Sequence, residues 1–325
     1  MVSDAIVVGS GVIGLTTAVV LAERGLRVEV WTRETAVQTT SAVAGGLWWP
    51  YRAEPARAVA AWSLASLPVM AALARDPEES GVRLVDGLHA GASPGELGAW
   101  AAGVPGLRDA APYEIPRGYD RAVRARLPLI DMPVHLGHLQ RRLGKAGGTV
   151  TLRPVTALAD AGRAAPLVVN CAGLGAGRLA GDPDVHPVRG QLVVVENPGV
   201  REWFTAAENG SGDPAYLLPQ PYGLVLGGTV RAHAWDRTPV PSLAQAIIAR
   251  CARIHPGVTR ARVLAHRVGL RPARHRVRLE AGRLPGGARL VHNYGHGGSG
   301  VTVSWGCAEE AAELALGDGP LRDGS

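Results

Sequence analysis

The sequence predicts an α/β fold in which a nucleotide-binding layer uses both ends of the chain and the middle forms a second domain. Residues 4–32 show the order strand, glycine turn, helix, strand, which is typical of a parallel sheet with a crossover helix. Residues 289–316 show a strand, a glycine-rich loop and a closing helix. Between these ends, short apolar segments favour a second, separate sheet. Each sheet needs a covering layer, so we expect two packed domains.

The N-terminal unit is the clearest local prediction. The apolar run Ala5–Val8 is expected to be a buried strand, and residues 12–24 carry apolar side chains at helical spacing. Gly25 ends this helix. Val28 and Val30 then alternate with polar residues, which predicts the second strand.

The turn between strand and helix, residues 9–14, has the sequence GSGVIG, the G-x-G-x-x-G pattern of dinucleotide binding. Gly9 permits the tight turn, Gly11 lets a diphosphate approach the backbone, and Gly14 lets the helix pack closely on the strand. The helix N-terminus also attracts phosphate charge. We therefore expect a dinucleotide at this turn.

The adenosine end of that dinucleotide has two candidate partners. Glu34 follows the second strand by a few residues and could bind the ribose hydroxyls. Arg33 could instead meet the adenylate. The sequence leaves both alternatives open.

The remaining elements follow from apolar spacing and from glycine and proline breaks. Residues 33–54 are expected to form a loop. Helices are expected at 55–75, 135–146, 241–255 and 301–316, and strands at 149–155, 166–171, 190–196, 215–228, 261–274 and 289–295. We assign to the nucleotide-binding domain residues 1–54, 131–178 and 265–325, and to the second domain residues 55–130 and 179–264.

Composition excludes several classes of protein. Apolar residues make up 46% of the 325-residue chain, as in an ordinary globular protein. The formal net charge of +6 comes from scattered arginines without a basic patch interleaved with aromatic residues, so we expect no nucleic-acid partner. The apolar run near the N-terminus is too short for a bilayer, and the residues before it lack a basic segment, so we expect no signal peptide. We expect a cytoplasmic protein with no membrane partner. Whether it forms a homodimer is left open.

Lysine, cysteine and histidine limit the chemistry further. Lys145 is the only lysine and lies in a polar turn, which argues against Schiff-base chemistry. The three cysteines are far apart and fit neither a disulfide framework nor a metal site. His135 and His138 have no obvious carboxylate or cysteine companions, so we expect no metal.

A second glycine-rich stretch, HNYGHGGSGVT at residues 292–302, lies between the last strand and the last helix. It places a second helix N-terminus where it can face an anion. Gly297, Gly298 and Gly300 would let the backbone contact a flat ring. A flavin needs such a site, because negative charge develops on its ring upon reduction and preorganised N–H groups stabilise that charge.

Three segments together resemble the D-amino-acid oxidase family of FAD flavoproteins: TTSAVAGGLWWPY, VGLRPARHRVRLE and HNYGHGGSGVTVSWG. The segments VVNCAGLGAG, VRGQLVVV and YLLPQPYGLVLGGT follow in the expected order, and the likeness runs from residue 5 to about residue 315. It implies a Rossmann-like FAD-binding domain built from both chain ends and a second α+β substrate domain with a mostly antiparallel sheet. The FAD would be bound non-covalently.

The resemblance also implies roles for particular residues. The diphosphate turn, the loop that wraps the flavin, the residue beside the adenine and the flavin-facing C-terminal loop each have counterparts here. The implied cofactor-binding residues, besides Gly9, Gly11 and Gly14, are Ser10, Val12, Ile13, Thr39, Thr40, Ser41, Gly45, Gly46, Leu47, Val155, Gly297, Gly298, Ser299, Gly300, Val301 and Thr302.

For the substrate, the resemblance implies that Arg271 binds the carboxylate, that the Tyr216 hydroxyl joins it, and that the Gly298 carbonyl accepts from the amine. A guanidinium holds a carboxylate through two parallel hydrogen bonds. Trp49 would line the pocket. Arg271 lies on a strand with further arginines, Arg274, Arg276 and Arg278, most of which we expect to be solvated.

The sequence departs from the family pattern at the substrate end. Gly212 stands where relatives commonly have a second tyrosine above the pocket, and Trp49 stands where many have a polar residue. Relatives that act on acidic substrates have arginine directly after the GGT strand. Here Val230 holds that place and Arg231 follows, facing the other side of the strand. These differences favour neutral substrates over D-aspartate.

The reaction implied is oxidative deamination of a D-amino acid. A hydride leaves Cα for flavin N5, so no general base is required, and orientation together with flavin electronics carries the catalysis. The imine hydrolyses to a 2-oxo acid and ammonia, and molecular oxygen reoxidises the flavin to give hydrogen peroxide. His292 and His296 flank the glycine loop, and we expect both to be structural hydrogen-bonding residues.

Several other functions stay open on sequence alone. They are a glycine or sarcosine-type amine oxidase, a D-aspartate oxidase, and a flavin-binding sensor without turnover. The glycine loop lacks the cysteine of covalent-flavin sarcosine oxidases, and Lys145 is misplaced for oxygen activation. An NAD-dependent dehydrogenase would leave the second glycine loop unexplained. A serine hydrolase would need G-x-S-x-G, which the residues around Ser299 do not provide.

Overall fold

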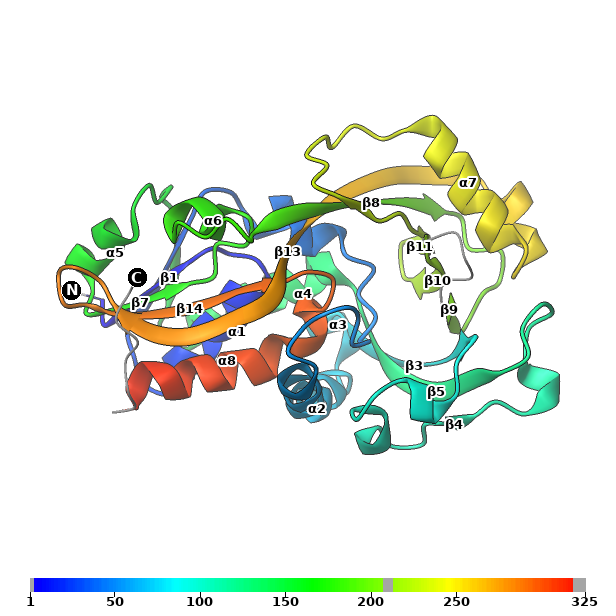
Figure 1. Cartoon of the computed structure of the whole chain (residues 1–325), viewed down its shortest axis with the longest axis horizontal. Coiled ribbons are helices and arrows are strands. Elements are labelled where there is room, and N and C mark those ends of the chain that lie inside the picture. Colours follow the sequence, from blue (N-terminus) through cyan, green and yellow to red (C-terminus); the bar gives the residue numbers. More distant parts are fainter. Residues whose placement is uncertain (1–2, 207–212, 318–325) are drawn as a thin grey trace.

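The computed structural model describes residues 3–206 and 213–317 (Figure 1). The strands are β1 (Ala5–Val8), β2 (Val28–Thr32), β3 (Val82–Ala90), β4 (Arg108–Asp109), β5 (Ala122–Ile130), β6 (Thr149–Leu152), β7 (Leu167–Asn170), β8 (His186–Val195), β9 (Trp203–Ala206), β10 (Ala215–Gln220), β11 (Gly223–Gly227), β12 (Arg231–Ala232), β13 (Val263–Arg283) and β14 (Arg289–His296). The helices are α1 (Val12–Glu23), α2 (Ala56–Leu73), α3 (Pro77–Ser80), α4 (Met132–Lys145), α5 (Leu158–Ala164), α6 (Gly175–Leu179), α7 (Pro241–Ala252) and α8 (Gly300–Leu316).

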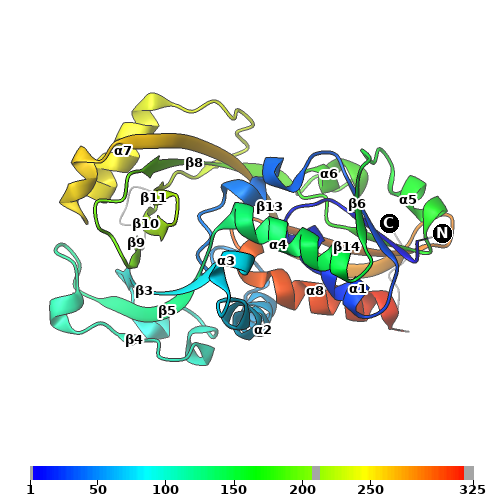
Figure 2. The same cartoon turned by 180° about the vertical axis from the view of Figure 1, so that it is seen from behind.

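Both chain ends meet in one parallel layer, as the sequence predicts. The strand order is β14-β7-β1-β2-β6, and every neighbouring pair in it is parallel. Figures 1 and 2 show α1, α4 and α8 on one face of this layer and α5 and α6 on the other. Two apolar clusters fill the two faces, one around α1 and α8 and one between α5 and the strands.

The other part of the chain is a mostly antiparallel sheet. Its order is β4-β5-β3-β9-β10-β11-β8, in which only the β3–β9 pair is parallel. Helix α7 covers one face through Ala244, Ile247 and Cys251. The mixed α/β fold class is therefore confirmed.

Strand β13 changes one expectation. The sequence led us to expect two separate sheets, but β13 pairs with β8 along Val263–Ala273 and with β14 mainly along Arg278–Arg283. One long strand thus belongs to both parts and makes the sheet continuous (Figure 1). Its pairing with β14 is irregular between Ala273 and Arg278. Hydrophobic spacing could not reveal this double pairing, because arginines interrupt the pattern there.

Helix boundaries differ slightly from the predictions. Helix α4 begins at Met132 instead of residue 135, because the carboxylate of Asp131 accepts a hydrogen bond from the backbone N–H of Val134 and Pro133 occupies the first turn. Helix α5 was not predicted. It has only seven residues, Leu158–Ala164, too few to give a clear apolar period.

Helix α2 is apolar enough, by length and composition only, to cross a membrane. A soluble core helix passes the same test. Its buried side packs on α8, where the Ser66 hydroxyl accepts from the backbone N–H of Gly306 at 2.9 Å. A Cβ on Gly306 would lie 2.3 Å from the Trp62 carbonyl oxygen, so the two helices cross in close contact.

Candidate active site

One cavity of about 590 Å³ joins both glycine-rich stretches. Its wall begins at the turn after β1, follows the loop after β2, and reaches the loop between β14 and α8 and the antiparallel sheet. Most of the residues predicted to bind cofactor or substrate line it. They are Gly9, Ser10, Gly11, Val12, Ile13, Arg33, Glu34, Thr39, Thr40, Ser41, Gly45, Gly46, Leu47, Trp49, Val155, Tyr216, Arg271, Gly297, Gly298, Gly300 and Val301.

The first glycine turn is shaped by close contacts. A Cβ on Gly9, whose φ is 110°, would lie 2.5 Å from the carbonyl oxygen of Cys171. A Cβ on Gly14 would lie 1.9 Å from the Gly9 carbonyl oxygen, so Gly14 serves helix–strand packing and does not line the cavity. The Ser41 hydroxyl accepts from the first helical N–H, that of Val12, at 2.9 Å. The turn therefore leaves bare backbone facing the cavity.

Ser10 lines the cavity but its side chain points into the structure. Its hydroxyl lies 2.8 Å from the Thr32 hydroxyl and donates to the carbonyl of Glu34 at 3.1 Å. These contacts fix the end of β2, where Arg33 and Glu34 both reach the cavity wall. Arg33 and Glu34 pair with each other at 3.5 Å, so both side chains lie at the predicted adenosine end.

In the second glycine loop, some residues face the cavity and others turn away from it. Gly297, with a φ of 55°, donates its N–H to the Pro272 carbonyl at 2.9 Å, and Gly298 faces the cavity beside Tyr51. Ser299 and Thr302 do not line the cavity. The Ser299 hydroxyl accepts from the N–H of Tyr51 at 2.8 Å and donates to its carbonyl at 2.6 Å. These two hydroxyls hold the backbone of Trp49 and Tyr51 on the opposite wall, and the contact of Ser299 and Thr302 with the cofactor stays a prediction.

Arg271 and Tyr216 lie together at the antiparallel end of the cavity. Two glycines make room for them. A Cβ on Gly190 would lie 2.3 Å from the Arg271 Nη1, and a Cβ on Gly227 would lie 1.9 Å from the Tyr216 Cζ. Arg271 Nη1 donates to the Thr229 carbonyl at 3.3 Å. Burial raises the pKa of Tyr216, and the Arg271 cation opposes that rise, so the hydroxyl stays protonated at neutral pH.

The residues after the GGT strand are arranged as predicted. Val230 lines the cavity, whereas Arg231 is exposed and binds Asp213 through two contacts at 2.7 and 3.0 Å. The guanidinium of Arg231 is thus committed to a surface carboxylate. Gly212, the other predicted difference from the family pattern, lies outside the described residues.

Sequence reasoning missed several residues of the cavity wall, notably His89 and Thr205. His89 Nδ1 lies 2.8 Å from the Thr205 hydroxyl, and its ring packs on Trp49 with centroids 4.6 Å apart. Burial lowers the pKa of His89 to about 4, so the ring is neutral at pH 7. A single histidine in an apolar strand is usually a core residue, and no local pattern marked it.

The expectations for the neighbouring histidines and arginines need correction. His292 does contact Asn170, at 3.3 Å, but Nε2 of His296 is buried without a partner among the described residues. Arg274 and Arg278, expected to be solvated, are less than a quarter exposed and pair with Asp182. The pairing partner lies far away in sequence, which is why the strand pattern alone suggested solvation.

The comparisons with known proteins decide the family. The family model for FAD dependent oxidoreductases, DAO, matches residues 4–314. The chain belongs to this family. It is 59% identical to a D-amino-acid oxidase of Streptomyces coelicolor, over 96% of both chains, and 48% identical to one of Rubrobacter xylanophilus, over 97% of this chain and 96% of the other. Among solved structures, glycine oxidase from Geobacillus kaustophilus has a TM-score of 0.77 and 20% identity, covering 96% of this chain and 94% of that one, which shows the shared fold.

As a member of the DAO family the protein is an FAD-dependent oxidoreductase, and the cavity fits that cofactor. Its volume lies within the range of about 300–1,000 Å³ that small-molecule sites occupy. Bare glycine backbone faces it from both motifs. Asn293 and His296 also line it, and their Oδ1 and Nε2 atoms have no partner among the described residues.

Proposed function

We propose that this protein oxidises D-amino acids with neutral side chains to 2-oxo acids, ammonia and hydrogen peroxide. The observation that carries the proposal is the Arg271–Tyr216 pair at one end of the cavity that both glycine motifs line. The two curated relatives described above support the substrate class, since both are named D-amino-acid oxidases. Molecular oxygen is the second substrate in this proposal.

The chain's own residues bind and orient the substrate. Arg271 and the protonated Tyr216 hydroxyl bind the carboxylate, and the Gly298 carbonyl accepts from the amine. Fixing both groups turns Cα toward the glycine loop and limits its freedom, which is how positioning lowers a barrier. When bound, FAD supplies the two-electron acceptor and its reaction with oxygen supplies the peroxide.

No residue of the wall needs to act as a general base. The two buried histidines there, His89 and His296, have pKa values lowered by burial to about 4 and about 3. A base with so low a pKa holds a proton poorly at neutral pH. We therefore assign catalysis to orientation, with removal of the proton from the amine left to solvent.

The preference for neutral side chains rests on charge. Arg271 is assigned to the substrate's main carboxylate, and the nearby Arg231 is committed to Asp213. A second carboxylate directed at Val230, Trp49 and a neutral His89 would meet no cation among them, and Arg237, which also lines the cavity, is exposed to solvent. Burying it there without a partner costs free energy. We also propose a cytoplasmic location.

The proposal is tested by peroxide formation in air with matched pairs of D- and L-amino acids, D-aspartate, glycine and sarcosine. We expect the highest kcat/KM with neutral D-amino acids and a stoichiometric 2-oxo acid. A higher kcat/KM for glycine, sarcosine or D-aspartate than for neutral D-amino acids would contradict the proposed substrate class. Absence of peroxide with every amine would favour a flavin-binding sensor.

A further inference from the structure

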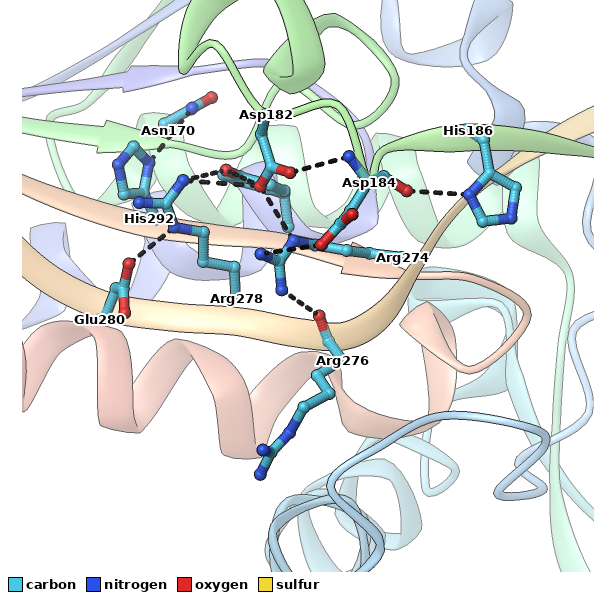
Figure 3. A network of polar contacts seen from close by, with 10 residues as sticks. Asn170, Asp182, Asp184, His186, Arg274, Arg276, Arg278, Glu280 and His292 are labelled. Carbon is cyan, nitrogen blue, oxygen red and sulfur yellow. Dashed lines mark hydrogen bonds and ion pairs between the residues drawn. The ribbon is translucent and has the colours of Figure 1, made fainter. Parts of the chain in front are cut away.

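Asp182, in the turn after α6, is the centre of a buried polar network (Figure 3). Its side chain is 4% exposed. One carboxylate oxygen accepts from the Tyr294 hydroxyl at 2.8 Å, from Arg274 Nε at 2.9 Å and from Arg278 Nη1 at 3.5 Å. The other accepts from the backbone N–H of Asp184 at 3.1 Å. The carboxylate is thus fully engaged.

The network spans the irregular part of β13. Pairing between β13 and β14 breaks between Ala273 and Arg278, where the strand passes from the antiparallel part to the parallel layer. Arg274 lies just inside this break and Arg278 lies at its end. Asp182 binds both, and Figure 3 shows their side chains converging on it from the same strand. The carboxylate therefore links the two ends of the break through side chains, while the backbone N–H of Val277 inside the break donates to the Glu54 carbonyl at 2.7 Å.

The same network reaches both halves of the site. Arg271 is three residues before Arg274 on β13, and Tyr294 is three residues before Gly297 on β14. A Cβ on Gly295 would lie 2.8 Å from the Arg274 Cβ, so β14 and the arginine are in close contact. Gly295, in β14, thus makes room for Arg274.

The charges around Asp182 are nearly balanced. Arg278 Nε also donates to Glu280 at 2.6 Å, and Arg274 pairs more loosely with Asp184 at 3.6 Å. Arg276 is exposed and contributes its carbonyl, which accepts from Arg274 Nη1 at 3.0 Å. Asp182 is the only carboxylate in this network that binds both arginines and Tyr294 among the described residues.

We infer that Asp182 is a positioning residue that fixes Arg271 relative to the loop carrying Gly297 and Gly298. Asp182 does not line the cavity. It holds the break in β13 in one conformation, so that the carboxylate-binding arginine and the flavin-facing backbone keep a constant separation. The inference rests on the proposed function for the identity of the substrate, whereas the contacts of Asp182 are independent of it.

The test uses the holoenzyme and the variant Asp182→Asn, which keeps the size and removes the charge. We expect KM for a neutral D-amino acid to rise about tenfold or more, since small misplacement of a binding group is costly, while the FAD dissociation constant changes less than about threefold. The matched control is Glu196→Gln. Glu196 directly follows β8 and pairs with Arg262, which directly precedes β13, so the pair lies at the end of β13 away from Arg274. Both side chains are exposed, so the loss of the Glu196 charge should leave KM unchanged.

A second readout does not need turnover. Propionate is alanine without its amine and cannot be oxidised, so its dissociation constant, read from the shift of the flavin spectrum, reports carboxylate binding alone. We expect Asp182→Asn to weaken propionate about tenfold while FAD binding is kept. This readout stands even if no D-amino acid is turned over, which would overturn the proposed function separately.

Two outcomes would overturn the inference. Unchanged KM and propionate binding would show that Arg271 does not depend on Asp182. Parallel loss of FAD binding, propionate binding and thermal stability would show a general structural role. If Asp182→Asn does not fold, Arg274→Lys keeps the charge and removes the Nε–H donor to the carboxylate at a residue that does not line the cavity, and the same two readouts apply with smaller shifts.

Discussion

The hydroxyl of Thr302 binds both backbone polar groups of Trp49. It accepts from the Trp49 N–H and donates to its carbonyl, each at 3.0 Å. Ser299 does the same for Tyr51. The N-terminal end of α8, with its N-cap Ser299, thus holds two alternate residues of the opposite cavity wall, and the Trp49 ring contacts Trp100 and His89.

Thr302→Val should loosen this wall, because valine keeps the shape and leaves two backbone groups of Trp49 unpaired. We expect a rise in KM for the D-amino acid and a loss of stability of about 1–3 kcal/mol. Chemical denaturation and steady-state kinetics measure both. Ser304→Ala is the control, since that hydroxyl donates to the Val301 carbonyl at 3.0 Å within the same helix and has no other hydrogen-bond partner among residues 3–206 and 213–317. An unchanged KM would show that this part of the cavity wall does not contribute to substrate binding.

Arg271→Ala should keep the flavin spectrum and weaken the substrate. A charged hydrogen-bonded contact contributes about 1.5–3 kcal/mol, so KM should rise roughly tenfold to 150-fold. Arg267→Ala is the matched control on the same strand, because Arg267 stacks on Tyr222 at 4.5 Å and lies outside the cavity wall. Equal KM values for the wild type and Arg271→Ala would take Arg271 out of the site.

Gly9→Ala should prevent FAD binding. The added methyl would lie 2.5 Å from a backbone oxygen that cannot move freely, and the φ of 110° disfavours any side chain. Gly144→Ala is the control, because no atom lies within 4 Å of the added Cβ and the residue is helical. Retention of the yellow colour by purified Gly9→Ala protein would contradict this role.

Val230→Arg should shift selectivity toward D-aspartate. It places a cation in the cavity wall where Arg231, bound to Asp213, cannot reach. We expect the ratio of kcat/KM for D-aspartate to that for D-alanine to increase at least about tenfold, as for one new charge-assisted contact. An unaltered ratio would show that residue 230 does not face the substrate side chain.

Stability should fall as pH drops from 6.5 toward 4. Burial lowers the pKa of His89, His135 and His292 to about 4 and that of His296 to about 3. The unfolded chain therefore binds more protons within this window, and unfolding becomes easier by up to about 1.4 kcal/mol per histidine and pH unit. Urea unfolding at pH 7 and pH 5.5 measures the effect. His135→Gln should reduce the slope; equal stability at both pH values would contradict the assignment.

The local N-terminal unit was predictable because strand, turn and helix are all specified within residues 4–32. The meeting of the two glycine motifs in one cavity was predictable from the resemblance. Side-chain contacts between segments that are distant in sequence were not predictable. Neither the binding of Arg274 by Asp182 nor that of His89 by Thr205 leaves a local pattern, since the partners come from distant segments.

The roles of the second-loop residues also required the fold. The sequence treats Ser299 and Thr302 as part of a cofactor loop, yet their hydroxyls turn toward residues 49 and 51. Helical geometry alone cannot decide which side of a loop faces a ligand. The position of residues 49 and 51 opposite the start of α8 decides which way these hydroxyls point.

Anaerobic titration of the purified protein tests the central claim most directly. The oxidised flavin is yellow and loses its visible absorbance when it accepts two electrons. We predict that neutral D-amino acids bleach the protein and that their L-enantiomers do not. A colourless protein that takes up no FAD, or a yellow one bleached only by L-amino acids, glycine or sarcosine, would contradict the account.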